Sequence, residues 1–249
     1  MPAFVLMKAF ENAPAQYDGA MEFLTLGRIR TLKHEIAALV RGSGRRVLDL
    51  GCGAGSLAIM MAKQGAHVVG IDTSESMLQV AQQRLAAERL GDRVEVRRLS
   101  AMEIDAFAPE SFDFVVSTLT LSEFSDAELE FVLAESQKLL SPGGQLLIGD
   151  ETIATGRLRR WCFAAVRLPL QLITYLATQA QSLAAKRWAV RALYFAIELP
   201  LMLLVFFFVP PSSRPLRDIE LRLRRAGFRL TRVSGYLGGT LKLVCAARG

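Results

Sequence analysis

The stretch Val47-Leu48-Asp49-Leu50-Gly51-Cys52-Gly53-Ala54-Gly55 decides the fold of this 249-residue chain. The apolar run over residues 46–50 predicts a buried strand, and the glycines predict a tight turn into a helix that reaches about Gln64. A second predicted strand, His67–Ile71, ends at Asp72. Glycines at such a turn let a ligand approach the backbone, and an acidic residue at the end of the next strand can bind ribose hydroxyls.

Strands and helices continue to alternate on both sides of this stretch, which predicts an α/β fold. We expect a Rossmann-like, seven-stranded, mostly parallel sheet with a C-terminal antiparallel hairpin and an apolar helical insert after the fifth strand. The remaining predicted elements are helices at Gly19–Val40, Ser76–Leu90, Asp126–Leu140 and Leu216–Ala226, and strands at Val94–Leu99, Phe112–Ser117, Gln145–Gly149, Phe228–Val233 and Leu241–Ala246.

Composition divides the chain into unlike parts. Residues 1–150 carry 14 basic and 20 acidic side chains, whereas residues 151–249 carry 16 and 4, and apolar residues concentrate between about Trp161 and Val209. A basic half beside an apolar run is typical of a protein that meets anionic lipid headgroups, and a solvated arginine-rich surface is the alternative. The expected parts are a lid and helix (1–45), a cofactor-binding core (46–156), the insert (157–215), and a helix and hairpin that complete the sheet (216–249).

The three cysteines, Cys52, Cys162 and Cys245, are far apart and form no metal-ligand or disulfide spacing. We therefore expect no structural metal, and the cysteine usage fits a reducing cytoplasm. The first ten residues lack the charged start and long apolar core of a signal peptide.

The glycine spacing, together with Asp49 and Asp72, resembles motif I of the class I S-adenosylmethionine-dependent methyltransferases. That resemblance implies S-adenosylmethionine as the cofactor. It also implies that Asp49 orders the loop and the amino group of the cofactor, and that Asp72 accepts from both ribose hydroxyls. The cofactor-binding residues expected on this basis are Asp49, Gly51, Cys52, Gly53, Gly55, Asp72, Thr73, Met77, Ser100, Ala101, Met102 and Ser117.

The expected adenine site departs from the family pattern, which places an acidic residue just after the third strand. This chain has Ser100-Ala101-Met102 there, with Glu103 next. Met102 is expected to stack on the base, and Ser100 or a backbone carbonyl to accept from its amine.

Further segments resemble the group called corrinoid protein-associated methyltransferases. They include residues 11–18, residues 24–28, Leu121-Ser122-Glu123, Gly149-Asp150-Glu151 and residues 173–179. More distantly, Tyr17-Asp18 is similar to the ubiquinone/menaquinone C-methyltransferases.

The apolar run near residues 192–209 approaches the length of a membrane span but contains Glu198 and Pro200. The C-terminal hairpin must rejoin the sheet, which a single crossing does not permit. Basic residues flank the run at both ends. We therefore favour helices lying in the cytoplasmic face of a membrane, in contact through about residues 161–209. A two-helix span and a water-soluble lid or dimer interface are the alternatives, and the oligomeric state is open.

Methyl transfer to a carbon or hydroxyl acceptor also requires a base. Asp150 is the favoured candidate because the strand ends of open α/β sheets face the ligand crevice. Glu123 and Tyr17 are further catalytic candidates, with Asp18 and His34 also possible from the lid. We expect a lipophilic acceptor, such as a quinone-like ring, a lipid or a tetrapyrrole.

Two other functions stay open. One is a non-catalytic protein that binds the cofactor and docks at a membrane. The other is methylation of nucleic acid, which the basic C-terminal half would suit. It is less favoured. Residues 117–120 lack the Asn/Asp-Pro-Pro-aromatic element of base amino methylation.

Overall fold

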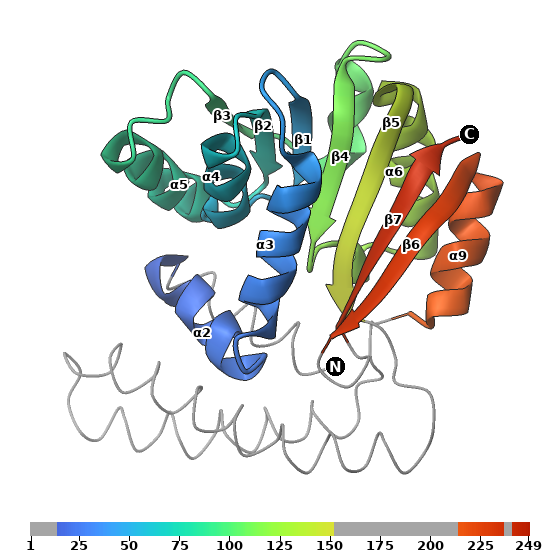
Figure 1. Cartoon of the computed structure of the whole chain (residues 1–249), viewed down its shortest axis with the longest axis horizontal. Coiled ribbons are helices and arrows are strands. Elements are labelled where there is room, and N and C mark those ends of the chain that lie inside the picture. Colours follow the sequence, from blue (N-terminus) through green and yellow to red (C-terminus); the bar gives the residue numbers. More distant parts are fainter. Residues whose placement is uncertain (1–13, 152–213, 237–240) are drawn as a thin grey trace.

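The computed structural model describes residues 14–151, 214–236 and 241–249. Their strands form one seven-stranded sheet in the order β3-β2-β1-β4-β5-β7-β6 (Figure 1). The first five strands are parallel, β7 runs antiparallel to β5, and β6 runs antiparallel to β7. This arrangement confirms the predicted α/β fold. The strands are β1 (Arg46–Leu50), β2 (His67–Asp72), β3 (Val94–Arg98), β4 (Phe112–Thr118), β5 (Leu140–Glu151), β6 (Phe228–Tyr236) and β7 (Leu241–Arg248).

Helices cover both faces of the sheet because successive strand side chains point to opposite sides. In β1, Val47 packs into the core beneath α3, α4 and α5, whereas Leu48 and Leu50 pack into the core beneath α6 and α9. The helical elements are η1 (Pro14–Gln16), α2 (Tyr17–Leu24), α3 (Arg28–Val40), α4 (Ser56–Lys63), α5 (Glu75–Ala87), η2 (Ala101–Ala106), η3 (Leu121–Glu123), α6 (Asp126–Leu139) and α9 (Leu216–Arg225).

The predicted single helix Gly19–Val40 is wrong, because the chain breaks between α2 and α3. Leu26 and Gly27 have positive φ angles of 50° and 75°, which no α-helix accommodates. Thr25 bridges the break, since its hydroxyl donates to the Met21 carbonyl at 2.7 Å and accepts from the Ile29 amide at 3.1 Å. The break turns α2 across the carboxyl ends of the parallel strands (Figure 1).

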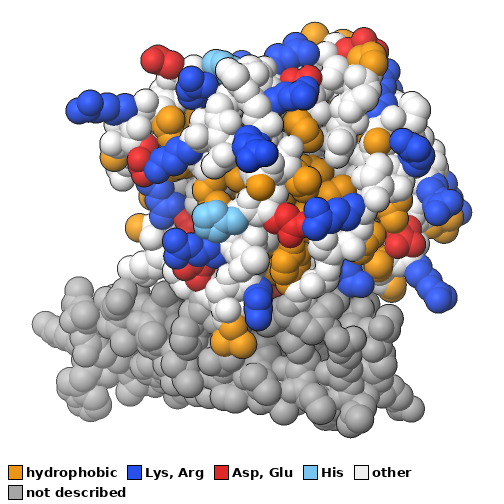
Figure 2. Space-filling view, viewed as in Figure 1, with side chains coloured by type: hydrophobic (Ala, Val, Ile, Leu, Met, Phe, Trp, Pro, Cys, Tyr) orange, Lys and Arg blue, Asp and Glu red, His pale blue; other side chains and the backbone are white. Residues whose placement is uncertain are grey.

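The C-terminal elements close the sheet and carry much of the positive charge. α9 buries Ile219 and Leu223 against the sheet, and Arg232 of β6 pairs with Glu35 of α3. Lys and Arg side chains are spread over the face that Figure 2 shows. Within the described ranges no helix combines the length and the apolar run that a membrane crossing needs. Nearly all of the predicted insert lies outside the described residues, so its membrane contact stays a prediction.

Candidate functional site

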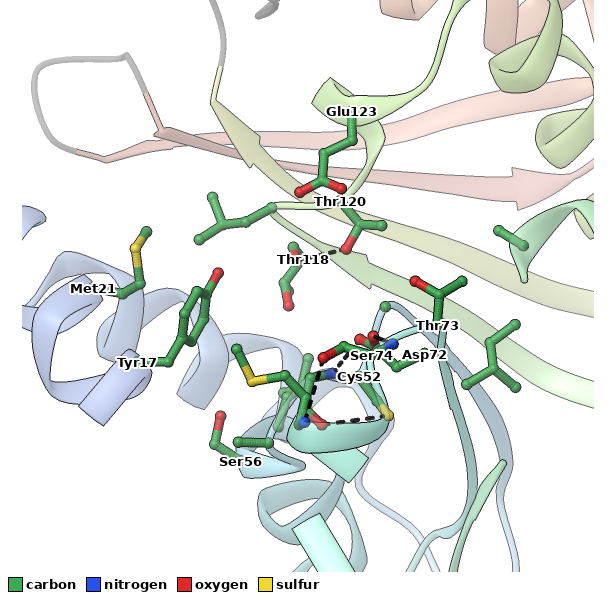
Figure 3. Close-up of a pocket in the computed structure, with 18 of the residues that line it drawn as sticks. Tyr17, Met21, Cys52, Ser56, Asp72, Thr73, Ser74, Thr118, Thr120 and Glu123 are labelled. Carbon is green, nitrogen blue, oxygen red and sulfur yellow. Dashed lines mark hydrogen bonds between the residues drawn. The ribbon is translucent and has the colours of Figure 1, made fainter. Parts of the chain in front are cut away.

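A cavity of about 180 Å³ opens at the carboxyl ends of the parallel strands, where the strand order reverses between β1 and β4. Ligands bind at this point in open α/β sheets. Two sets of residues face each other across it (Figure 3). The first, here called the glycine wall, comprises Gly51, Cys52, Gly53, Asp72, Thr73, Ser74, Met77, Ser100 and Ala101. The second, here called the tyrosine wall, comprises Tyr17, Met21, Thr118, Leu119, Thr120, Glu123 and Phe124.

The glycine loop has a backbone that only glycine adopts easily. Gly51 and Gly53 have φ angles of 72° and 52°. A Cβ added to Gly51 would stand 2.2 Å from the Thr120 hydroxyl oxygen, whereas one added to Gly53 would meet no atom within 4 Å. Gly51 therefore allows the two walls to approach each other, and Gly53 leaves open space beside the backbone.

Asp72 connects the end of β2 to this loop. One of its carboxylate oxygens accepts from the Gly53 amide at 2.8 Å, and the other accepts from the Ser74 amide at 2.9 Å. The Ser74 hydroxyl in turn accepts from the Met77 amide and caps α5. The carboxylate is thus held at the cavity wall in a defined orientation.

Asp49 lies behind the glycine loop, with only 1% of its surface exposed. Among the described residues, neither of its carboxyl oxygens has a hydrogen-bond partner. Burial raises the pKa of Asp49 to about 7, against the opposing charge of Lys33. A buried carboxyl group without partners costs free energy, which a ligand carrying positive charge or N–H donors would recover. This unsatisfied carboxyl fits the charged sulfonium and amino group of S-adenosylmethionine.

Asp18 joins the lid helix α2 to three elements of the core. Its carboxylate accepts from Lys33 at 3.0 Å, from Ser56 at 2.9 Å and from Arg84. Burial alone would raise the pKa of Asp18, but the charge of Lys33 and these hydrogen bonds outweigh burial and hold the pKa at about 2. Asp18 is therefore an ionised anchor of the lid, and its charge is already compensated.

The tyrosine wall presents a phenol and a carboxylate beside two threonines and several apolar side chains. The Tyr17 hydroxyl and the Glu123 carboxylate both project into the cavity, from α2 and η3 respectively (Figure 3). Burial, and next the negative charge of Glu123, raise the pKa of Tyr17 well above its ordinary value. The phenol is therefore neutral at physiological pH, and the carboxylate of Glu123 shares the cavity with it.

Most of the predicted cofactor residues line the cavity. These are Gly51, Cys52, Gly53, Asp72, Thr73, Met77, Ser100 and Ala101. Four others lie outside its lining: Asp49 stands behind the loop, Gly55 caps α4, Met102 packs against the core beneath α6 and Ser117 is buried in β4. The predicted stacking of Met102 on a base therefore has no support in its position.

The carboxylate of Glu103 does not line the predicted adenine site, because it caps the start of η2. It accepts from the Ser100 amide at 3.0 Å, while the Ser100 hydroxyl accepts from the Met102 amide at 3.1 Å. This capping box starts η2 and uses the nearest acidic side chain locally. Ser100 and Ala101 are left to line that part of the cavity, next to Met77.

Asp150, the base favoured from the sequence, lies away from this cavity. Its side chain is 4% exposed and lines a second, smaller cavity with Leu129 and Ile219. Burial raises the pKa of Asp150 to about 7, although amide hydrogen bonds from Glu151 and Ser122 oppose the shift. Tyr17 and Glu123, the other two predicted catalytic residues, do share the main cavity.

Sequence reasoning missed several residues at the site, including Met21, Lys33, Ser56, Arg84 and Thr120. Lys33 is four residues after Ile29, so both share one helix face, and both line the cavity. That periodicity was a usable signal, whereas nothing in the sequence indicated that Ser56 and Arg84 would both meet the Asp18 carboxylate. In the described ranges no three His, Cys, Asp or Glu side chains group as metal ligands.

Comparison with known proteins agrees with this geometry. Residues 47–144 match a family model described as a methyltransferase domain. The chain is 39% identical over 145 residues to a ubiquinone biosynthesis O-methyltransferase of Hahella chejuensis, covering 56% of this chain and 58% of that protein. It is 32% identical over 142 residues to a demethylmenaquinone methyltransferase of Lactiplantibacillus plantarum, covering 55% of this chain and 59% of that protein. The chain thus spans less than two thirds of the length of these relatives.

The fold has a counterpart among solved structures. A SAM-dependent methyltransferase from Aquifex aeolicus superposes with a TM-score of 0.56 at 20% identity, covering 87% of this chain and 89% of that one. The match of residues 47–144 to a methyltransferase domain and the shared fold agree with the class I S-adenosylmethionine-dependent methyltransferase predicted from motif I. Relatives named for quinone methylation agree with the more distant resemblance, while the corrinoid protein-associated grouping stays a prediction.

Proposed function

We propose that this protein transfers a methyl group from S-adenosylmethionine to a lipophilic acceptor with a quinone-like ring. One observation carries the proposal: the glycine wall, which contains Asp72 and has Asp49 behind it, faces a wall that holds a neutral phenol and a carboxylate across one cavity. Two relatives named for quinone biosynthesis support this choice of acceptor class.

The residues of the glycine wall would hold the cofactor. Asp72 is placed to accept from ribose hydroxyls, since its carboxylate already stands at the cavity wall beside the Gly53 amide. Asp49 would face the positive charge of the cofactor from behind the loop, and Lys33 offers a cation at the lid side. When bound, the cofactor supplies an activated methyl carbon, so the protein has mainly to align the acceptor and exclude water.

The tyrosine wall would align the acceptor and remove its proton. Met21, Leu119 and Phe124 offer apolar contact to a ring. The neutral Tyr17 hydroxyl is suited to donate a hydrogen bond to an acceptor oxygen, and Glu123 is suited to accept the proton that the acceptor loses. In this proposal Glu123 takes the role of general base that the sequence had favoured for Asp150.

A membrane source for the acceptor is the next part of the proposal. The apolar run of residues 192–209 and the basic residues around it suit contact with the cytoplasmic face of a membrane. A lipophilic acceptor would then reach the cavity from the bilayer. Flotation with anionic liposomes tests this part: the full chain should float, and a chain lacking residues 192–209 should float less.

The activity is tested by incubating the purified protein with methyl-labelled S-adenosylmethionine and a membrane lipid extract, then identifying the labelled product. Asp72→Asn should lose most of the labelling, because the ribose contact loses its charge. Asp92→Asn, a change at an exposed aspartate, is the matched control and should label as the wild type does. Cofactor binding by calorimetry without any labelled lipid product would instead favour the non-catalytic binding protein.

A further inference from the structure

The short helix η3, which carries Glu123, is held by two residues that lie far from it in the chain. A three-residue 3₁₀ turn makes too few internal hydrogen bonds to fix its own position. Asp150, at the end of β5, provides the first contact, because its carboxylate accepts from the Ser122 amide at 2.9 Å. The other carboxylate oxygen accepts from the Glu151 amide at 2.7 Å, which fixes the orientation of the group.

Arg214, which lies 93 residues after Leu121 in the chain, provides the second contact. Its guanidinium donates to the Leu121 carbonyl at 2.9 Å and to the Phe124 carbonyl, so it spans the turn on both sides of Glu123. It also donates to the Asp126 carboxylate at 3.2 Å, in the first turn of α6. The Arg214 side chain is only 14% exposed. A guanidinium presents its N–H donors in a rigid planar fork that can span acceptors on both sides of a turn, whereas a lysine ammonium is a compact point charge on a flexible stem.

The contacts act on a part of the chain that forms the tyrosine wall. The backbone groups of Leu121 and Ser122 are hydrogen-bonded to Arg214 and Asp150. The neighbouring residues of the turn line the main cavity, namely Thr120, Glu123 and Phe124. Asp150 and Arg214 do not line that cavity but a separate, smaller one behind the turn. Among the described residues they contact the turn without lining the main cavity, so we expect any effect on a molecule there to pass through the turn.

We infer that Asp150 and Arg214 are positioning residues, which together hold η3 so that the Glu123 carboxylate points into the main cavity. The inference rests on the proposed function, in which Glu123 accepts the proton of the acceptor. It assigns to the acidic residue at the end of β5 a role other than that of the base. It also assigns a role to an arginine that no motif singled out.

Steady-state kinetics of Arg214→Gln and Asp150→Asn test the inference. Each substitution should lower kcat by up to about 100-fold, because a small displacement of a catalytic group has effects of that size. The dissociation constant of S-adenosylmethionine should stay near the wild-type value, and both variants should remain folded with a modestly lower melting temperature, because hydrogen bonds of largely buried groups are lost. Arg217→Gln is the matched control, since Arg217 is an exposed arginine three residues further along the chain.

A double-mutant cycle with Glu123→Gln distinguishes positioning from a general structural role. If Arg214 acts through Glu123, Arg214→Gln should cause little further loss of kcat once Glu123 has been replaced. An equal loss in both backgrounds would overturn the inference. Arg214→Lys keeps the charge but not the fork, so its kcat should stay closer to that of Arg214→Gln than to the wild type. Full recovery by Lys would overturn the role assigned to the forked hydrogen bonds of Arg214.

Hydrogen exchange separates failure of this inference from failure of the proposed function. The Ser122 amide should exchange faster in Asp150→Asn and in Arg214→Gln than in the wild type, whether or not a product forms. If the wild type labels no lipid, the proposed function fails, and exchange still shows whether these residues hold the turn. Unchanged exchange at residues 121–124 in both variants would overturn the positioning role.

Discussion

The glycine wall is built mainly from one continuous stretch, residues 51–77, whereas the tyrosine wall is gathered from α2, the end of β4 and η3. On the glycine wall, the hydrogen bond from Gly53 to Asp72 joins residues 19 positions apart. The tyrosine wall depends on longer links, such as the contact between Arg214 and Leu121, 93 positions apart. The cofactor side is therefore determined by local chain geometry, and the acceptor side by how distant elements pack.

This difference implies that the two walls can be perturbed separately. The glycine wall lies mainly on a strand, a glycine turn and a helix that follow one another in the chain. The tyrosine wall depends on the hydrogen bonds of Asp18, which hold α2, and on those of Asp150 and Arg214, which hold η3. Changes to the tyrosine wall should mainly alter the turnover number, and changes to the glycine wall should alter cofactor affinity.

The largest expected effect comes from Glu123→Gln, which removes the proposed base and keeps the side-chain shape. Methyl transfer should fall by about 100- to 10,000-fold, the range typical of general-base removal. Cofactor affinity, measured by calorimetry, should change by less than about twofold, or about 0.4 kcal/mol, because Glu123 lies on the wall opposite the residues proposed to hold the cofactor. Glu88→Gln, which removes only an exposed pair with Lys63, is the control. A comparable loss of cofactor affinity in Glu123→Gln would contradict the separation of the walls.

The next largest effect should come from Gly51→Ala, where the walls touch. The new methyl would stand 2.2 Å from the Thr120 hydroxyl oxygen, on a residue with a φ angle of 72°. Overpacking and backbone strain should lower the free energy of unfolding by about 2–4 kcal/mol, measured in urea. Cofactor affinity should fall as well, because the loop must shift.

Two further variants sharpen the result at Gly51. Thr120→Ala in the Gly51→Ala background should recover part of the stability, since it removes the two nearest atoms. Gly91→Ala is the matched control, because a Cβ there meets nothing within 4 Å. If Gly51→Ala were as mild as Gly91→Ala, the close approach of the walls would be wrong.

A smaller effect is expected from Asp18→Asn, which weakens the lid anchor. Lys33 and Arg84 would lose their shared carboxylate, so the free energy of unfolding should fall by about 1–3 kcal/mol. Because the pKa of Asp18 is lowered to about 2, this stabilisation is present above about pH 4 and is lost as the pH falls towards 2. Urea titrations at pH 7 and pH 3 should show a larger wild-type advantage at pH 7. Asp105→Asn, at an exposed position, is the control.

The smallest effect is a pH dependence of cofactor affinity that arises from Asp49. Its pKa is raised to about 7, so its contribution to stability is present below about pH 4 and is lost as the pH rises through 7. A cationic ligand favours the ionised form, and binding therefore releases a proton. Affinity should rise a few-fold, and by at most about tenfold, between pH 6 and pH 8. Asp49→Asn should flatten this dependence, and calorimetry in buffers of different ionisation enthalpy measures the proton released.

Local patterns were sufficient for the fold and for the glycine wall. The apolar strands and the glycine turn predicted β1, β2 and the helices that follow, because each unit is continuous in the chain. The break at Leu26 and Gly27 was missed because apolar helical spacing continues across it. Only the positive φ angles and the Thr25 hydrogen bonds reveal the break.

The position of Asp150 shows where strand-end reasoning stops. Ile148 packs into the core beneath α6 and α9, and side chains two residues apart in a strand share a face. Asp150 therefore turns towards α6 and α9, away from the main cavity. The sequence indicates alternation along β5, but not which face of the sheet each set of side chains meets.

By itself, the sequence determined the α/β order, the glycine turn, and the carboxylates Asp49 and Asp72, because all of them depend on interactions within about 25 residues of chain. Only the tertiary structure decided that Tyr17 and Glu123 project into the same cavity. It also decided the hydrogen bonds of Asp18 with Lys33 and Arg84, and the hydrogen bond from Arg214 to the Leu121 carbonyl. These contacts join elements whose relative placement depends on packing of the whole core, which no short pattern encodes.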